Sequence, residues 1–156
     1  MDGTREALGA MSRLLPSTGV TGWLPTTMTS SGDAITRALS AIREARGRAT
    51  GAEILGANLE GPFISERYKG AQKACHIQKA HWDLVEPFTG LIRILTLAPE
   101  TLTDMDFIPR CCRAGIIVSL GHSDATYEEA ARAVSAGASH ITHLYNAMSP
   151  LHHRKP

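Results

Sequence analysis

The sequence lacks the features that mark several large classes of protein. Its 16 basic and 15 acidic side chains nearly cancel, so no charge excess would attract nucleic acid or an anionic membrane surface. No apolar run approaches the roughly 20 residues that cross a bilayer, and the first residues lack the basic and apolar regions of a secretory signal. We therefore expect no nucleic-acid partner, no membrane partner and a cytoplasmic location.

Cysteine is scarce, and several glycine and serine motifs are missing. Cys75, Cys111 and Cys112 are too few for a disulfide framework, so we expect free thiols in a reducing compartment. No G-x-G-x-x-G fingerprint, P-loop or G-x-S-x-G elbow occurs. These absences argue against a nucleotide site and against a serine hydrolase.

What the sequence does contain is a regular alternation of strand and helix patterns. Hydrophobic residues make up 43% of the 156 positions, enough for one domain with a substantial core. Helical periodicity is clearest over 35–42 and 127–134, and Thr126 with Glu129 has capping-box spacing. Between the helical patterns lie short apolar runs, typical of strands buried on both faces of a parallel sheet, at 20–24, 54–59, 91–97, 116–120 and 139–142.

The predicted fold class is α/β, a partial (β/α)8 TIM-type barrel of about five parallel strands alternating with five helices. A closed barrel of this type takes eight strands, so we predict one incomplete barrel domain over 1–156 with two open sheet edges. Pro109 interrupts the helical pattern between 100 and 114, which favours two short pieces there. No internal repeat or linker divides the chain.

Three potential metal ligands each stand at the end of a predicted strand. They are Glu60, directly before a Gly-Pro turn, His122 and His143. The carboxyl ends of parallel strands meet at one face of an α/β barrel. A carboxylate and two imidazoles leave one position of a tetrahedral divalent ion open for water, as a hydrolytic site needs. Taken alone, Glu60 fits a surface position before a turn equally well, and a lone histidine at a strand end is more often structural. It is the combination that favours a metal site.

Neighbouring residues suit an anionic ligand that forms hydrogen bonds. Asn146 and the backbone of Ala147 come soon after His143. Arg154 lies in a basic tail, and its guanidinium could hold a phosphate through two hydrogen bonds, or the tail could be a solvated terminus. The loop over 64–79, which includes Ala71 and Gln72, lacks helical periodicity, and loops over a barrel mouth usually carry substrate contacts.

At the level of motifs, the chain resembles the N-acetylglucosamine-6-phosphate deacetylases, metal-dependent barrels of the amidohydrolase superfamily. The matching blocks, in order, are N-L-E-G-P-F at 58–63, K-G-A-Q at 69–72, L-A-P-E at 97–100, G-H-S at 121–123 and T-H-L-Y-N-A-M at 142–148. The resemblance implies a hydrolase of amino-sugar catabolism that converts N-acetylglucosamine 6-phosphate to glucosamine 6-phosphate and acetate. It also implies that a divalent metal, Zn²⁺ or an ion such as Fe²⁺, is held by Glu60, His122 and His143.

The resemblance extends to the substrate and the assembly. It implies a homodimer for the full-length enzyme, a phosphate contact from Arg154, and sugar-phosphate contacts from Ala71, Gln72, Asn146, Ala147 and Arg154. Relatives often have His in place of Asn58 and of Gln72, which leaves the contact from Gln72 open.

The resemblance also implies that parts of the family's architecture lie outside this chain. The Asp that transfers protons in the family belongs to a later strand, and the early barrel strand and small β-sandwich have no counterpart in 1–156. We therefore expect metal and substrate ligands without a catalytic residue, and little or no turnover by the chain alone.

Two alternatives remain. One is another amidohydrolase-superfamily enzyme, of the dihydroorotase or deaminase type. It would be favoured if Arg154 and the loop around Gln72 did not converge beside the metal. The other is a non-catalytic gene remnant or a binding fragment.

Overall fold

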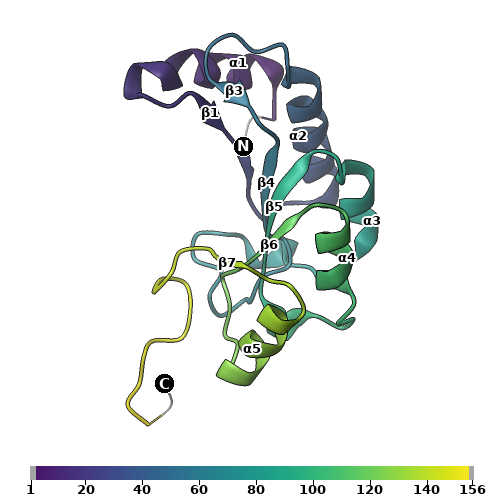
Figure 1. Cartoon of the computed structure of the whole chain (residues 1–156), viewed down its shortest axis with the longest axis vertical. Helices are drawn as coiled ribbons and strands as arrows, with labels where there is room; N and C mark the ends of the chain where they lie inside the picture. The colour runs from purple at the N-terminus through teal and green to yellow at the C-terminus, as the bar shows by residue number, and fades with distance from the viewer. Residues whose placement is uncertain (1–2, 155–156) are drawn as a thin grey trace.

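The computed structural model describes residues 3–154 as helices that alternate with short strands (Figure 1). The α-helices are α1 (Arg5–Leu14), α2 (Gly32–Ala45), α3 (Trp82–Val85), α4 (Phe107–Arg113) and α5 (Tyr127–Ser135). The strands are β1 (Gly22–Trp23), β2 (Thr26–Thr27), β3 (Glu53–Ile54), β4 (Ala57–Glu60), β5 (Ile92–Leu97), β6 (Ile117–Leu120) and β7 (His140–Ile141). Short 3₁₀ helices are η1 (Leu15–Thr18), η2 (Ala74–His76), η3 (Glu86–Phe88) and η4 (Pro99–Thr101).

Five strands form one parallel sheet in the order β2-β4-β5-β6-β7, and β1 pairs with β3 in a separate parallel pair. In Figure 1, α2, α3 and α4 stack along one side of the sheet, and the segment after β7 extends away from the rest. Within the five-stranded sheet, successive strands are joined by crossovers to the parallel neighbour, the connection on which barrels of this type are built. The predicted α/β class with five parallel strands is confirmed.

The strand predicted at 54–59 is divided into β3 and β4, whereas the strand predicted at 20–24 contains only β1 and is followed, after Pro25, by β2, which was not predicted. Pro25 separates β1 from β2, and Leu55 and Gly56 separate β3 from β4. Pro25 has no N–H to give to a ladder, although its carbonyl accepts a hydrogen bond from the N–H of Asn58 (3.0 Å). At Gly56 an added Cβ would lie 2.6 Å from the Leu91 carbonyl oxygen, so only glycine fits there.

The helix ends follow the local sequence chemistry. The capping box of α5 is present, because the Glu129 N–H donates to Thr126 Oγ1 (3.2 Å) and the Thr126 N–H donates to Glu129 Oε2 (2.8 Å). The segment around Pro109 is divided into η4 and α4, as predicted. Pro109 lies in the first turn of α4, where a missing N–H costs no intrahelical hydrogen bond.

Alternation along the strands separates the core from the opposite face of the sheet. Ala57 and Leu59 of β4 are buried, and Leu59 is in register with Leu95 of β5. Asn58 and Glu60 point to the other face and are only partly buried. The helix-covered face therefore holds the apolar core, while the other face brings polar groups to the ends of the strands.

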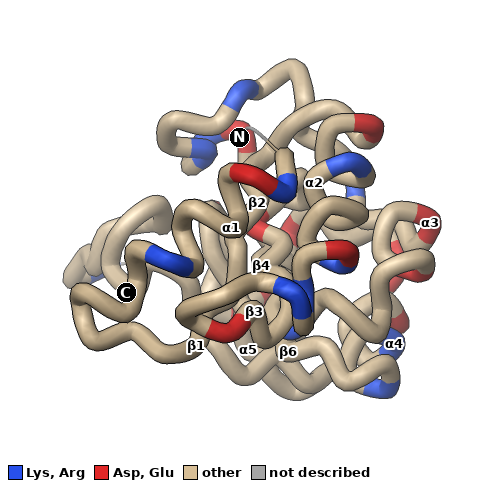
Figure 2. Tube along the Cα trace, turned by 90° about the horizontal axis from the view of Figure 1, so that it is seen from above, with Lys and Arg blue, Asp and Glu red and all other residues tan. Residues whose placement is uncertain are grey.

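The surface carries charges of both signs. Figure 2 shows basic and acidic residues on α1 and α2, an acidic residue on α3 and basic residues on α4. The ion pairs Arg113–Asp106 (3.0 Å) and Arg67–Asp124 (2.9 Å) lie at the surface, where solvent screens the charges, so each contributes little to stability. In the part of the chain that the structure describes, no helix is both long and apolar enough to cross a membrane.

The three thiols should differ in reactivity. Cys111 is buried in α4, and burial raises the pKa of its thiol to about 12, whereas Cys75 and Cys112 are exposed. Since the thiolate is the reactive form, a disulfide-exchange reagent should modify Cys75 and Cys112 in the folded chain and Cys111 only after denaturation. Counting released chromophore before and after adding guanidinium checks this. A Cys111→Ala variant that lost a fast-reacting thiol would contradict it.

Candidate metal centre

The structure brings Glu60, His122 and His143 together from three different strand ends. Glu60 is the last residue of β4, His122 lies two residues past β6, and His143 lies two residues past β7. Glu60 Oε1 is 3.0 Å from His122 Nε2 and 3.1 Å from His143 Nε2. One ligand atom from each residue lies within 4.8 Å of the others, close enough to share one divalent ion.

Unusual backbone conformations aim the two imidazoles. His122 has φ of 50° and His143 has φ of 55°, both in the left-handed region, where residues other than glycine are uncommon. Gly121 lets the two loops approach each other, because a Cβ there would lie 2.7 Å from the Cβ of Thr142. Such strained residues persist only where the surrounding structure holds them, and they cluster at functional sites.

A backbone carbonyl orients His122. The Tyr68 carbonyl oxygen is 2.8 Å from His122 Nδ1, and a carbonyl only accepts, so Nδ1 carries the proton. This leaves Nε2 directed at Glu60. A histidine whose second nitrogen donates to a carbonyl has its ring orientation and tautomer set for ligating a metal through Nε2.

Glu60 and His122 change each other's protonation. The hydrogen bond to His122 holds the pKa of Glu60 below its ordinary value, although burial acts in the opposite direction. The same hydrogen bond raises the pKa of His122, again against burial, and the Tyr68 carbonyl adds to the rise. Without a metal, these two groups therefore favour a carboxylate beside an imidazolium.

This pair should give the metal-free chain a pH-dependent stability with two limbs. The pKa of Glu60 is below 4.5, so its stabilising contribution is present above pH 4.5 and is lost as pH falls through the lowered folded-state pKa. The pKa of His122 is above 6.5, so its contribution is fully present below pH 6.5 and is lost as pH rises through the raised folded-state pKa. Urea unfolding in EDTA at stepped pH measures both limbs. If His122→Gln kept the upper limb, His122 would not be its source.

The predicted substrate residues are placed unevenly around this cluster. Gln72 is only 3% exposed, and its Nε2 lies 3.2 Å from His122 Nε2, while its Oε1 accepts from the Thr29 N–H (2.8 Å). Ala71 is exposed beside Gln72, and both line a cavity of about 260 Å³. The loop from 64 to 79 therefore reaches the metal cluster and carries a polar side chain into it.

The predicted residues after β7 lie in the segment that holds His143. Asn146 is exposed, and its N–H donates to the His143 carbonyl (2.6 Å). The Ala147 carbonyl accepts from the Ser123 N–H (3.1 Å). Arg154 is exposed, and its Nε is 3.2 Å from His153 Nε2. Over residues 3–154, no hydrogen bond or ion pair joins Arg154 to the cluster, so its role stays a prediction.

A row of hydroxyls beneath the cluster was not predicted from the sequence. Thr142 Oγ1 lies 2.8 Å from Thr96 Oγ1 and 2.7 Å from Ser119 Oγ, so it links the ends of β5, β6 and β7. Since Thr142 directly precedes His143, this row fixes the segment that bears the imidazole. The register Glu60–Thr96–Ser119 across β4, β5 and β6 is the signal that could have found it.

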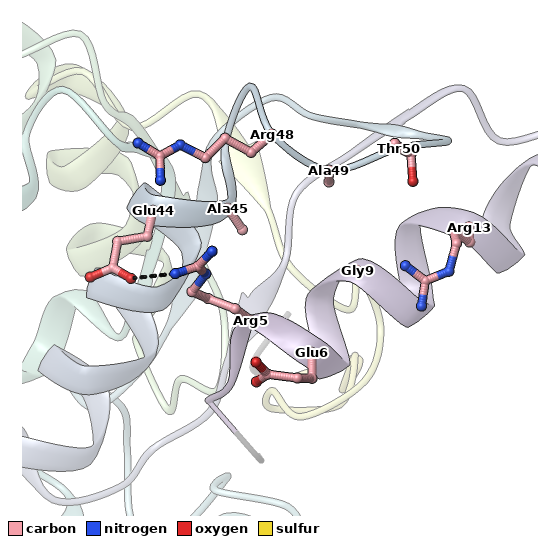
Figure 3. A pocket seen from close by; sticks show the side chains of 9 residues that line it. All are labelled: Arg5, Glu6, Gly9, Arg13, Glu44, Ala45, Arg48, Ala49 and Thr50. Carbon is pink, nitrogen blue, oxygen red and sulfur yellow. Dashed lines mark ion pairs between the residues drawn. The ribbon is translucent and has the colours of Figure 1, made fainter.

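Other polar groups of the described chain lie outside the cluster. No aspartate between residues 3 and 154 belongs to it; Asp106 and Asp124, for example, form ion pairs with Arg113 and Arg67. A groove of about 340 Å³ between α1 and α2 has the Arg5–Glu44 ion pair (3.9 Å) across it (Figure 3). None of the residues that line this groove belongs to the metal cluster or comes from a strand end.

Among known proteins, this chain is similar to N-acetylglucosamine-6-phosphate deacetylases. No protein-family model matches the chain. The N-acetylglucosamine-6-phosphate deacetylase of Bacillus subtilis is 43% identical over 164 residues, an alignment that covers 100% of this chain and 41% of that protein. The chain is a homologue of one part of the N-acetylglucosamine-6-phosphate deacetylases. It spans about two fifths of the length of the curated relatives it matches.

Solved deacetylase structures share the fold. The N-acetylglucosamine-6-phosphate deacetylase of Thermotoga maritima superposes with a TM-score of 0.86 at 34% identity, over 94% of this chain and 40% of that one. A variant of the Mycobacterium smegmatis deacetylase, solved in complex with N-acetyl-D-glucosamine-6-phosphate, has a TM-score of 0.79 at 30% identity, over 87% of this chain and 36% of that one. The five-stranded sheet thus matches part of the TIM-type barrel of these deacetylases.

Proposed function

We propose that Glu60, His122 and His143 form the metal centre of a deacetylase that acts on N-acetylglucosamine 6-phosphate. The single observation that carries the proposal is the meeting of one carboxylate oxygen and two imidazole Nε2 atoms within 4.8 Å at three strand ends. The donor set fits the group, since carboxylate oxygen and imidazole nitrogen are ordinary ligands of zinc, and Fe²⁺ accepts the same donors. A divalent ion held there supplies Lewis-acid activation for hydrolysis of an amide.

The chain's own residues would divide the remaining work. Tyr68 sets the His122 ring through its carbonyl, which leaves Nε2 available at the cluster. The Gln72 amide is fixed by Thr29, so its NH₂ group faces the cluster and could donate to a substrate oxygen. We propose sugar contacts from Ala71, Gln72, Asn146 and Ala147, and a phosphate contact from Arg154 after the tail folds back.

We propose that residues 1–156 form one incomplete barrel domain and that the deacetylase activity requires the complete barrel. The proton-transfer aspartate implied by the family resemblance has no candidate in the described cluster. A homodimeric full-length enzyme and a cytoplasmic location remain predictions of the sequence.

One alternative function keeps the metal centre and changes the substrate. Within the described residues, Arg154 contacts His152 and His153 and does not contact the metal cluster. This favours a different amidohydrolase, of the dihydroorotase or deaminase type. Full-length protein assayed for acetate release, dihydroorotate hydrolysis and ammonia release separates the two. Acetate from N-acetylglucosamine 6-phosphate supports the deacetylase, and either other product supports the alternative.

The metal centre itself is tested by isothermal titration of the EDTA-treated chain with Zn²⁺. We expect saturable binding of one ion per chain, together with proton release, because His122 must give up its Nε2 proton to ligate. Absence of saturable binding would refute the proposed centre.

A further inference from the structure

A carboxylate from a fourth strand end holds the loop that bears His122. Glu100 lies in η4, directly after β5. Its Oε2 accepts from Ser123 Oγ (2.7 Å), and its Oε1 accepts from the Asp124 N–H (2.6 Å). Both distances are short, as expected for hydrogen bonds to a charged acceptor.

Glu100 is committed to this loop. The side chain is half-buried, and no ion pair within residues 3–154 includes it. The exposed cation nearest in sequence to the cluster, Arg67, pairs instead with the Asp124 side chain (2.9 Å). The two donors on the residues after His122 therefore supply the main compensation for placing this carboxylate in a half-buried position.

The same loop is joined to the loop that bears His143. The Ser123 N–H donates to the Ala147 carbonyl (3.1 Å), and Ser123 forms a parallel bridge with Met148. His122, His143 and Ala147 all have positive φ, a conformation that surrounding contacts must maintain. Ser123 thus contacts Glu100 with its hydroxyl and the second histidine loop with its backbone.

We infer that Glu100 is a positioning residue for the metal centre, acting through Ser123 and Asp124 to hold both histidine loops in the ligating arrangement. The inference rests on the proposed metal centre. Glu100 touches none of the three ligand side chains in the described hydrogen bonds, so it acts on the site only through the backbone of the two loops.

The test replaces Glu100 with glutamine, which keeps the shape but turns one acceptor oxygen into a donor that faces another donor. Glu129 provides a matched control. It too accepts from a backbone N–H (Thr126, 2.8 Å) and a hydroxyl (Thr126 Oγ1, 3.1 Å), but at the start of α5. Co²⁺ is titrated into the wild-type chain, Glu100→Gln and Glu129→Gln, and affinity and the visible absorption spectrum are recorded.

We expect Glu100→Gln to bind Co²⁺ about 10-fold to 100-fold more weakly and with an altered spectrum, as is typical for residues that orient metal ligands. Glu129→Gln should lose stability to urea without a change in affinity or spectrum. Ser123→Ala should weaken binding in the same direction, and its effect should not add to that of Glu100→Gln, because both act on one contact. If Glu100→Gln bound Co²⁺ as Glu129→Gln does, the positioning role would be wrong and the metal centre would stand.

A second readout needs no metal. In the EDTA-treated chain, the side-chain nitrogen signals of His122 report its contact with Glu60 (3.0 Å). We expect Glu100→Gln to shift these signals and Glu129→Gln to leave them in place. If the wild-type chain fails to bind Co²⁺, the metal centre is refuted, and the histidine signals alone decide whether Glu100 positions the loops. Unshifted signals in Glu100→Gln would overturn that role.

Discussion

Replacing Glu60 with glutamine should weaken zinc binding by the chain on the order of 100-fold or more, the largest effect expected of any single substitution. Glu60 Oε1 is the atom that both imidazoles meet, at 3.0 Å and 3.1 Å. Changes to groups that merely orient metal ligands already cost 10-fold to 100-fold in affinity, so loss of a charged ligand should reach or pass the top of that range. Competition with a chromophoric chelator at neutral pH measures the change.

Two controls separate ligand loss from general damage. Glu66→Gln removes a carboxylate from an exposed position in the same region and should bind zinc like the wild type. His143→Gln should weaken binding in the same way as Glu60→Gln, whereas His140→Gln should not, because His140 lies outside the described cluster. Zinc binding by Glu60→Gln within tenfold of the wild type would show that the carboxylate is not a ligand.

Strand-end positions allowed the cluster to be anticipated from the sequence. Parallel strands end at the same edge, so Glu60, His122 and His143 could be grouped once their strands were recognised. The hydrophobic periodicity does not predict the left-handed backbone at His122 and His143. This backbone conformation turns the rings toward Glu60. That conformation depends on contacts between loops, and a single sequence does not reveal those.

The contacts of Tyr68 and Gln72 with His122 could not be predicted from the sequence for a related reason. Tyr68 acts through its carbonyl, which every residue possesses, so its side chain gives no signal. Gln72 lies in a loop without periodicity, where spacing does not predict direction. The division of the strand predicted at 54–59 shows the converse. Gly56 is visible in the sequence, but the apolar residues around it outweighed it in the prediction.

The zinc-loaded chain should hydrolyse N-acetylglucosamine 6-phosphate about 10²-fold to 10⁴-fold more slowly than the full-length Bacillus subtilis relative, or not measurably. The expected loss in rate equals the rate enhancement that a positioned general acid or base contributes. Within residues 3–154, Glu60 is the only carboxylate in the cluster, and its hydrogen bonds to both imidazoles commit it there. Asp124, the aspartate closest in sequence to His122, pairs with Arg67. Acetate release, measured with zinc at saturation, gives the rate.

A blank, a reference enzyme and added formate together identify the cause of a low rate. Glu60→Gln supplies the blank for contaminating activity, and the relative from Bacillus subtilis, 43% identical over the shared region, supplies the reference. Added formate can replace a missing carboxylate, so a formate-dependent rise in the wild-type chain but not in Glu60→Gln would indicate an intact metal centre that lacks only its proton carrier. A rate within tenfold of the relative, without formate, would instead mean that a group already in this chain transfers the proton. Glu100 would then be the first carboxylate to examine, because it holds the backbone beside His122.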